Sequence, residues 1–250
     1  MTNEWRKLIH RNFDKAATSY NKNAEIQRAI AIKLAKLISK ESIPNGIWLD
    51  LGSGTGLLAD SLETLNPKQS VIRVDISKNM IDQQEAECLK RVWDLNLGLP
   101  LLPEPPTLLA SNFVLHWLVD PTARLHEWFN TLASGGWIAL SIPIEGSFPE
   151  WYQASKIAKV PCTAIELPSQ DSLLKNFNSK QIQNKEVIRV SQTASNISTL
   201  LKSMKKVGAH ASHNPSLSIT DWRKLMKAWP VMKDKQGKLT WLIQILLIQK

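Results

Sequence analysis

The 250-residue sequence predicts an α/β fold with a doubly wound, mostly parallel sheet. Two observations support this prediction. Short apolar runs alternate with stretches in which apolar residues recur at helical spacing, and glycine- or proline-rich turns separate the two kinds of segment. The alternation of strand and helix persists through five strands, which is typical of parallel sheets whose crossover helices cover both faces.

The first half of the chain contains the most regular units. Each apolar run there is followed directly by a turn and then by an amphipathic stretch. The predicted elements are a helix over residues 25–38, a strand over 47–51, a helix from Leu58 to before Pro67, a strand over 71–76, and a helix capped by Ser77 and running to about residue 91.

The second half begins with a loop over residues 97–106, which holds four prolines. Periodicity weakens over residues 143–185, so this segment is predicted to be a lid inserted over the site. The other predicted elements are strands over 107–110, 137–142, 187–190 and 239–248, and helices over 122–132, 195–207 and 220–228. No linker divides the chain, so we expect one domain over 1–250, with helices of residues 1–40 lying over the site.

Composition places the protein in a reducing, cytoplasmic compartment. The two cysteines, Cys88 and Cys162, match no metal or redox spacing. The N-terminus carries charged residues such as Arg6 and Arg11 among its apolar ones, unlike a signal peptide. The apolar run at 241–248 is far shorter than the roughly 20 residues of a membrane helix. We therefore expect no membrane partner and no metal.

The net charge of +9 predicts a positive field around the protein. Such a field steers acidic partners, which include nucleic acid, an acidic protein or an anionic metabolite. The sequence has no dense basic run, so the charge is equally compatible with a general role in solubility.

A glycine-rich turn joins the first predicted strand to its helix. Three glycines at alternate positions, in the order Gly52, Gly54 and Gly56, allow the backbone to come close to an anionic ligand at a helix start. A dinucleotide fingerprint requires glycine where Leu57 stands, and a nucleotide-triphosphate loop requires Gly-Lys-Ser/Thr. The segment 50–56 instead resembles the Asp/Glu-x-Gly-x-Gly-x-Gly pattern of class I methyltransferases.

That resemblance implies a Rossmann-like fold with a seven-stranded sheet and S-adenosyl-L-methionine as cofactor. The cofactor-binding residues that it implies in the turn are Asp50, Gly52, Ser53, Gly54 and Gly56.

Further cofactor candidates follow the next strands. Asp75 ends the second strand about twenty residues on, where a carboxylate can accept hydrogen bonds from both ribose hydroxyls. Asp94 can accept from an adenine amino group, or it is a solvent-exposed loop residue. Ile76 and Met80 can pack an adenine ring, although apolar residues at this spacing are also ordinary core. Asn112 follows the fourth strand at the edge where ligands bind in such sheets, or serves a turn.

Segments outside the glycine turn resemble one particular family within the class I methyltransferases. They are residues 13–20, 24–28, Ser111-Asn112, His116-Trp117, 146–150, 201–209 and 228–230. Together they are similar to the pattern of the malonyl-acyl-carrier-protein O-methyltransferases of biotin synthesis, the BioC family, and the match covers nearly the whole chain.

The chain departs from that pattern in three places. Trp93-Asp94 stands where the family usually has Gly-Asp, Pro105-Pro106 where it has Phe-Asp, and His116 where Gln is common. The departures concern Asp94 and the adenine pocket, and they leave the methyl-donor turn intact.

The resemblance implies methylation of the free carboxylate of a malonyl thioester on acyl carrier protein. This carboxylate is ionised at neutral pH, with a pKa of about 4, so no catalytic acid or base is expected. Substrate-positioning residues are then Tyr20, Gln27, Arg28, His116 and Trp117, although Tyr20 and Arg28 are also compatible with an exposed helix face and Trp117 with ordinary packing. The residues expected to dock the acidic carrier are Lys202, Lys205 and Lys206, for which a solvated helix face is the alternative. We expect a monomer.

Two other functions are compatible with the sequence. One is a methyltransferase that acts on another small carboxylate or on RNA. The other is a non-catalytic nucleic-acid-binding module, although no aromatic-basic RNA motif is present. Methyl transfer to malonyl carrier protein, compared with malonyl-coenzyme A and bulk RNA, distinguishes these functions.

Overall fold

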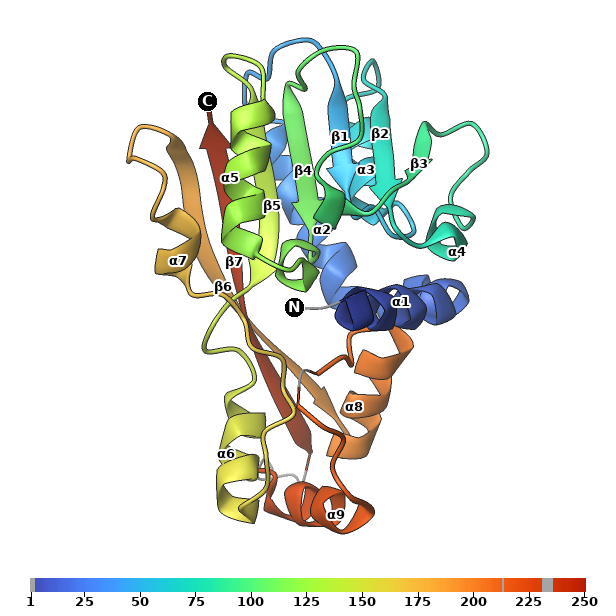
Figure 1. Ribbon diagram of the computed structural model, residues 1–250, viewed down its shortest axis with the longest axis vertical. Coiled ribbons are helices and arrows are strands. Elements are labelled where there is room, and N and C mark those ends of the chain that lie inside the picture. The colour runs from blue at the N-terminus through green and yellow to red at the C-terminus, as the bar shows by residue number, and fades with distance from the viewer. Residues whose placement is uncertain (1–2, 213, 231–235) are drawn as a thin grey trace.

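A seven-stranded sheet forms the centre of the computed structural model, which describes residues 3–212, 214–230 and 236–250 (Figure 1). The strands follow the order β3-β2-β1-β4-β5-β7-β6 across the sheet. Their bounds are β1 Trp48–Leu51, β2 Val71–Asp75, β3 Lys90–Val92, β4 Leu108–Asn112, β5 Trp137–Pro143, β6 Ile182–Ala194 and β7 Gly237–Gln249.

The sheet is mostly parallel, as the sequence predicts. Strand β1 pairs in parallel with both β2 and β4, and β4 pairs in parallel with β5. Strand β7 alone runs the other way, antiparallel to β5 and to β6. Because chain order reverses between β1 and β4, these two strands form a topological switch point, the place where such sheets bind ligands.

Helices cover both faces of the sheet. Helices α2 and α3 pack together on one face, whereas α5 and α7 lie on the other (Figure 1). The helices described are α1 Asn3–Asn23, α2 Glu25–Ile38, α3 Leu57–Leu65, α4 Lys78–Ile81, α5 Pro121–Thr131, α6 Pro149–Ala158, α7 Gln170–Leu174, α8 Ile197–Lys206 and α9 Ile219–Ala228.

The core is divided by the sheet into two layers. Successive strand side chains point to opposite faces, so Leu108 joins the layer under α2 and α3 while Leu109 joins the layer under α5. Both side chains are fully buried, and burial of each contributes roughly 1.5–3 kcal/mol relative to exposure. Helices on both faces of the sheet thus explain why successive apolar side chains of β4 are all buried.

Helices α6, α8 and α9 lie beyond the carboxyl edge of the sheet (Figure 1). Figure 1 shows α1 crossing this edge, while the long strands β6 and β7 continue past it toward α6, α8 and α9. Helix α1 contacts both α4 and α8. It therefore lies between the switch point and the far end of the molecule. None of the helices in the described part of the chain is long and apolar enough to cross a membrane.

Ser77 caps α4 as predicted, its hydroxyl accepting from the Met80 N–H, but the predicted extent of this helix to about residue 91 is wrong. Helix α4 ends at Ile81, and the edge strand β3 begins at Lys90. Residues 82–89 are mostly polar, and Leu89 is 53% exposed, so the segment has no apolar stripe to bury against the sheet.

The predicted strand at 187–190 is too short. Strand β6 spans Ile182–Ala194, and its side chains alternate between half-buried and exposed. It is an edge strand, so polar residues on its exposed face interrupt the apolar run that would have marked its length. The first residues of β6 also occupy the end of the segment predicted as a lid, 143–185, which otherwise contains α6 and α7.

Candidate functional site

The glycine turn opens onto a cavity at the switch point. Gly52, Gly54 and Gly56 all have positive φ, of 73°, 53° and 94°, which favours glycine. A Cβ on Gly52 would overlap the side chain of Val114, whereas a Cβ on Gly54 would meet nothing within 4 Å. Gly54 therefore presents bare backbone to open space.

Asp75 holds this turn from the end of β2. Its Oδ2 accepts a hydrogen bond from the Gly54 backbone N–H at 2.8 Å, and its Oδ1 accepts from the Ser77 N–H at 2.8 Å. Burial raises the pKa of Asp75 above its ordinary value, although these hydrogen bonds oppose the shift. The carboxylate thus lies half-buried at the cavity wall.

The first cavity has a volume of about 90 Å³ and lies between the turn and α1. Seven of the predicted cofactor residues line it, namely Gly52, Gly54, Asp75, Ile76, Met80, Asp94 and Asn112. The structure thereby brings together residues from the turn after β1, from β2, α4 and β4, and from the loop after β3.

The other three predicted cofactor residues lie behind the cavity wall. The Oδ2 of Asp50 accepts from the Ala59 N–H at 3.1 Å, and Oδ1 has no hydrogen-bond partner in the described structure. Burial raises the pKa of Asp50 to about 7. The Ser53 hydroxyl accepts from the Gln84 amide at 3.1 Å. A Cβ at Gly56 would meet the Arg73 guanidinium. These residues support the turn from inside the fold.

Asp94 is paired with Arg6 of α1. The Arg6 guanidinium donates to Asp94 Oδ2 through Nε, at 2.9 Å, and through Nη2. Asp94 Oδ1 accepts from the backbone and side-chain amides of Asn96, both at 2.9 Å. Burial alone would raise the pKa of Asp94, but these hydrogen bonds hold it below its ordinary value. The carboxylate is therefore an anion that ties α1 to the loop after β3.

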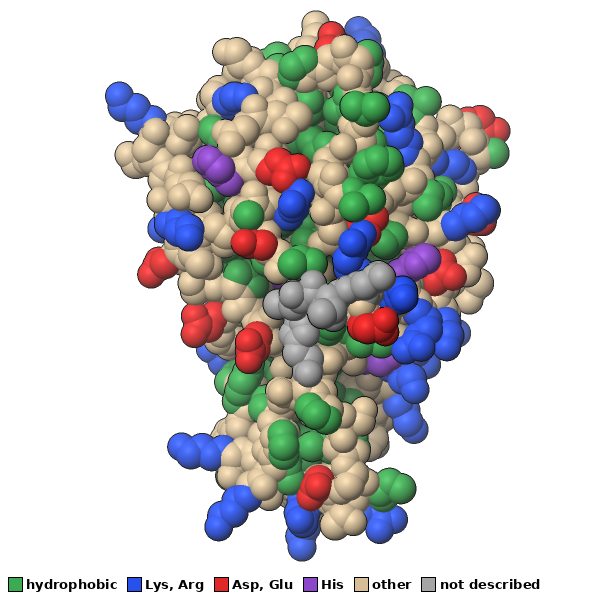
Figure 2. Space-filling model, viewed as in Figure 1, with side chains coloured by type: hydrophobic (Ala, Val, Ile, Leu, Met, Phe, Trp, Pro, Cys, Tyr) green, Lys and Arg blue, Asp and Glu red, His purple; other side chains and the backbone are tan. Residues whose placement is uncertain are grey.

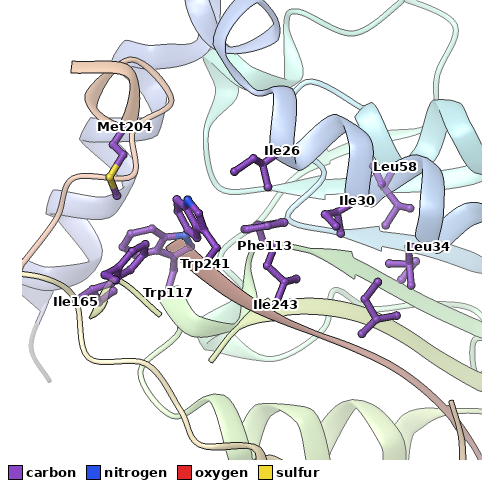
Figure 3. Close-up of a cluster of buried hydrophobic side chains, with 14 of the residues drawn as sticks. Ile26, Ile30, Leu34, Leu58, Phe113, Trp117, Ile165, Met204, Trp241 and Ile243 are labelled. Carbon is purple, nitrogen blue, oxygen red and sulfur yellow. The ribbon is translucent and has the colours of Figure 1, made fainter. Parts of the chain in front are cut away.

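A second, smaller cavity of about 20 Å³ adjoins the first. Four side chains line both cavities, namely Phe13, Tyr20, Phe113 and Trp117. Figure 3 shows part of the wall of the second cavity, where Met204 of α8 points toward the group formed by Trp117, Trp241 and Ile165. The Phe13 and Trp117 rings meet edge to face, with centroids 5.6 Å apart. An aromatic partition thus separates the two cavities.

Tyr20 and His116 are the ionisable side chains that line this second cavity. Burial raises the pKa of Tyr20, and the negative charges of Asp75 and Asp50 add to the shift. Burial lowers the pKa of His116 to about 3. Its Nδ1 has no hydrogen-bond partner in the parts of the chain that the structure describes. At neutral pH, both side chains are uncharged.

Three further predicted substrate residues occupy different places. Gln27 lines the second cavity, and its backbone oxygen accepts from the Asn112 side chain at 3.0 Å. Trp117 lines both cavities. Arg28 is exposed and donates to the backbone oxygen of Asn21 at 2.8 Å, and it lines neither cavity. The structure therefore does not place Arg28 beside the other four predicted substrate residues, which all line the second cavity.

The three predicted docking lysines are exposed on α8. Figure 2 shows Lys and Arg side chains gathered on the side of the molecule where α1 and α8 lie. Lys202 and Lys205 line a surface groove beside α1, and Lys206 lies next to it.

Sequence reasoning missed several lining residues of the first cavity. They include Arg6, Ile9 and Phe13 from α1, Trp93 after β3, and Val114 after β4. One available signal was the spacing of Ile9, Phe13 and Tyr20, which places them on one side of a helix. The Arg6 contact had no such signal, because its partner Asp94 lies 88 residues away.

Comparison with known proteins agrees with this geometry. A family model for a methyltransferase domain matches residues 3–242. A malonyl-[acyl-carrier protein] O-methyltransferase of Marinomonas sp. is 24% identical over 252 residues, covering 93% of this chain and 89% of that protein. One of the same name from Alcanivorax borkumensis is 25% identical over 256 residues, covering 97% and 86%.

A solved structure of a Bacillus halodurans protein described as a methyltransferase is similar in fold. It is 14% identical, has a TM-score of 0.58, and covers 87% of this chain and 98% of that chain. The predicted Rossmann-like fold and the resemblance to malonyl-acyl-carrier-protein O-methyltransferases are both confirmed.

Proposed function

The chain belongs to the methyltransferase domain family, and we propose that it methylates the free carboxylate of a malonyl thioester on acyl carrier protein, an early step of biotin synthesis. Its methyl donor is S-adenosylmethionine. One observation supports the acceptor most directly: an uncharged second cavity adjoins the glycine-turn cavity, and the two share Tyr20 and its aromatic neighbours as a common wall. The names of the full-length relatives agree with this acceptor.

The first cavity fits the methyl donor. Gly54 leaves space that a side chain would fill. A carboxylate oxygen can accept more than one hydrogen bond, so Asp75 can bind ribose hydroxyls while it holds Gly54 and Ser77. Ile76 and Met80 offer apolar wall to the adenine ring. When bound, the donor supplies an electrophilic methyl group on a sulfonium.

The second cavity fits an anionic acceptor that needs no base. A malonyl carboxylate is ionised at neutral pH, since its pKa is about 4. His116, whose pKa is about 3, is a very weak base and does not need to act as one. Tyr20 keeps its proton because its pKa is raised, so its hydroxyl can donate to the carboxylate. Gln27 offers an amide to the same cavity.

The residues of this chain then act by alignment and by exclusion of water. Correct placement of two reacting groups can be worth roughly 7–11 kcal/mol. Phe13, Phe113 and Trp117 form the apolar wall where the cavities meet. Charges that neutralise one another during reaction react faster when water is excluded. We propose that the segment 143–185 helps to close this site, because Phe148, Ile165 and Leu167 line the second cavity.

The carrier protein is proposed to approach the face that holds α8. The net charge of +9 favours an acidic partner, and Lys202, Lys205 and Lys206 are exposed there. A cytoplasmic location is part of the same proposal, since the synthesis of fatty acids on carrier protein takes place there.

The decisive experiment measures transfer of labelled methyl groups from S-adenosylmethionine to malonyl carrier protein. Malonyl-coenzyme A, unacylated carrier protein and bulk RNA serve as parallel acceptors. We expect methyl ester formation on the malonyl thioesters, with the carrier-bound form favoured. Labelling of RNA, or of no malonyl thioester at all, would refute the proposal.

A further inference from the structure

A third cavity lies outside the site described above. It is a surface groove of about 600 Å³ between α1, α8 and α9. Its apolar wall includes Leu8, Leu201 and Trp222. Ser198, on the first turn of α8, also lines it. The groove is large enough to hold an extended chain.

The groove contains buried donors that have no partner. Asn12 is 7% exposed and Trp151 is 9% exposed. Asn12 Nδ2 and Trp151 Nε1 are both buried, and neither has a hydrogen-bond partner in the described residues. An unpaired buried donor costs about 1–3 kcal/mol. Both residues line the groove, so we infer that carbonyl oxygens of a bound chain are the acceptors that these donors lack.

The charges at the groove indicate an anionic occupant. Arg11, Lys202 and Lys205 line it, and no acidic side chain lines it within the described ranges. Arg11 and the two lysines come from different helices, α1 and α8. A phosphate at this place would meet positive charge from both sides.

The groove adjoins the second cavity. Met204 and Ala209 line both. The second cavity in turn shares Phe13 and Tyr20 with the first. Three adjoining cavities, each sharing wall side chains with the next, therefore lie between the basic surface and the glycine turn.

We propose that this groove binds the phosphopantetheine arm of the carrier protein, with Met204 and Ala209 at the neck through which the thioester reaches the second cavity. The inference rests on the proposed function and extends it from the reacting carboxylate to the arm. That arm is long and flexible, with amides along its length and a phosphodiester at its outer end. Its chemistry matches the buried donors inside the groove and the cations at its rim.

The test measures binding rather than methyl transfer. Carrier protein bearing the arm, without malonyl, is compared with carrier protein lacking the arm. Ser198→Trp fills the groove from an exposed position, so the core is left intact. Thr199→Trp is the matched control, because Thr199 is exposed on the same turn but does not line the groove.

We expect the wild-type protein to bind the arm-bearing carrier about tenfold or more tightly than the armless carrier. This difference should vanish in Ser198→Trp and persist in Thr199→Trp. Equal binding of both carriers by the wild type, or a difference that survives in Ser198→Trp, would overturn the inference. Arm-dependent binding without methylation of malonyl carrier protein would instead refute the malonyl acceptor and leave the groove assignment standing.

Discussion

The Asp75 carboxylate accepts a hydrogen bond from the Gly54 backbone N–H at 2.8 Å, joining the end of β2 to the glycine turn that follows β1. The two residues are 21 positions apart in sequence. Both line the first cavity. The contact fixes the Gly54 N–H while the bare Cα faces the first cavity, where we propose that the methyl donor binds.

Asp75→Ala should weaken binding of S-adenosylmethionine by tenfold or more, because it removes both the donor's hydroxyl acceptor and the support of Gly54. Loss of a hydrogen bond to a charged group costs about 1.5–3 kcal/mol. Calorimetric titration measures the affinity. Asp82→Ala, at an exposed position just after α4, is the control and should bind like wild type. Equal affinity in the two variants would contradict the assignment.

Gly54→Leu should abolish stabilisation by S-adenosylmethionine while the protein still folds. Ligand at 100 times its dissociation constant stabilises a native protein by about 2.7 kcal/mol, which thermal unfolding detects. The new side chain would project into the cavity. Gly135→Leu controls for backbone strain, because Gly135 also has positive φ, at 74°, but lies outside the cavity. A ligand-induced shift that persists in Gly54→Leu would refute the role of the turn.

Tyr20→Phe should reduce kcat/KM for malonyl carrier protein by about tenfold, since one hydrogen-bond donor of roughly 1–1.5 kcal/mol is lost. Affinity for the methyl donor should not change. Steady-state kinetics and titration separate these two effects. Tyr152→Phe is the matched control, because Tyr152 is exposed and is the other tyrosine of the chain. A parallel loss of donor affinity in Tyr20→Phe would mean that Tyr20 is structural.

The glycine turn and its strand were predictable because their signals are local. The turn requires positive φ at successive glycines, and the strand before it is fully buried, so both patterns can be read from a few adjacent residues. Asp75 followed from the turn, since the β-α-β unit determines which strand end lies beside it.

The rest of the site depends on contacts between distant segments. Arg6 meets Asp94 only because α1 crosses the carboxyl edge of the sheet. Arg28 lies on an amphipathic helix, and its spacing alone did not reveal that the guanidinium stays at the surface. Strand β3, of three residues, is too short for a periodicity to be detected.

Asp50→Asn should remove a pH dependence from the stability of the ligand-free protein. In the unfolded chain Asp50 loses its proton near pH 4, but in the folded protein its pKa is about 7. Between these values the folded state binds a proton that the unfolded state lacks, so the free energy of unfolding falls as pH rises.

From pH 4 to pH 8, the unfolding free energy of Asp50→Asn should therefore rise relative to wild type by roughly 4 kcal/mol, with most of the change complete by pH 7. Chemical denaturation at several pH values measures this difference. Asp82→Asn, an exposed control, should follow the wild-type curve. Parallel curves for wild type and Asp50→Asn would show that Asp50 is ionised in the fold.

Simultaneous replacement of Lys202, Lys205 and Lys206 by glutamate should raise KM for both malonyl thioesters, and more for malonyl carrier protein than for malonyl-coenzyme A. Both acceptors carry the arm whose phosphate would lose Lys202 and Lys205, but only the carrier has an acidic protein surface that these exposed lysines would also meet. The wild-type preference for carrier protein should also decline with salt, because the Debye length falls from about 10 Å at 0.1 M to about 3 Å at 1 M.

The control for this reversal is an equal charge change elsewhere on the molecule. Lys36, Lys40 and Lys68 are exposed and none lines any of the three cavities. Their triple replacement by glutamate lowers the net charge by the same amount, so it measures the effect of long-range steering alone. If the two triple variants raise KM for carrier protein equally, net charge is sufficient and the lysines of α8 do not form the docking surface. A larger effect of the α8 variant, greatest on the carrier-bound acceptor, places the carrier on that helix.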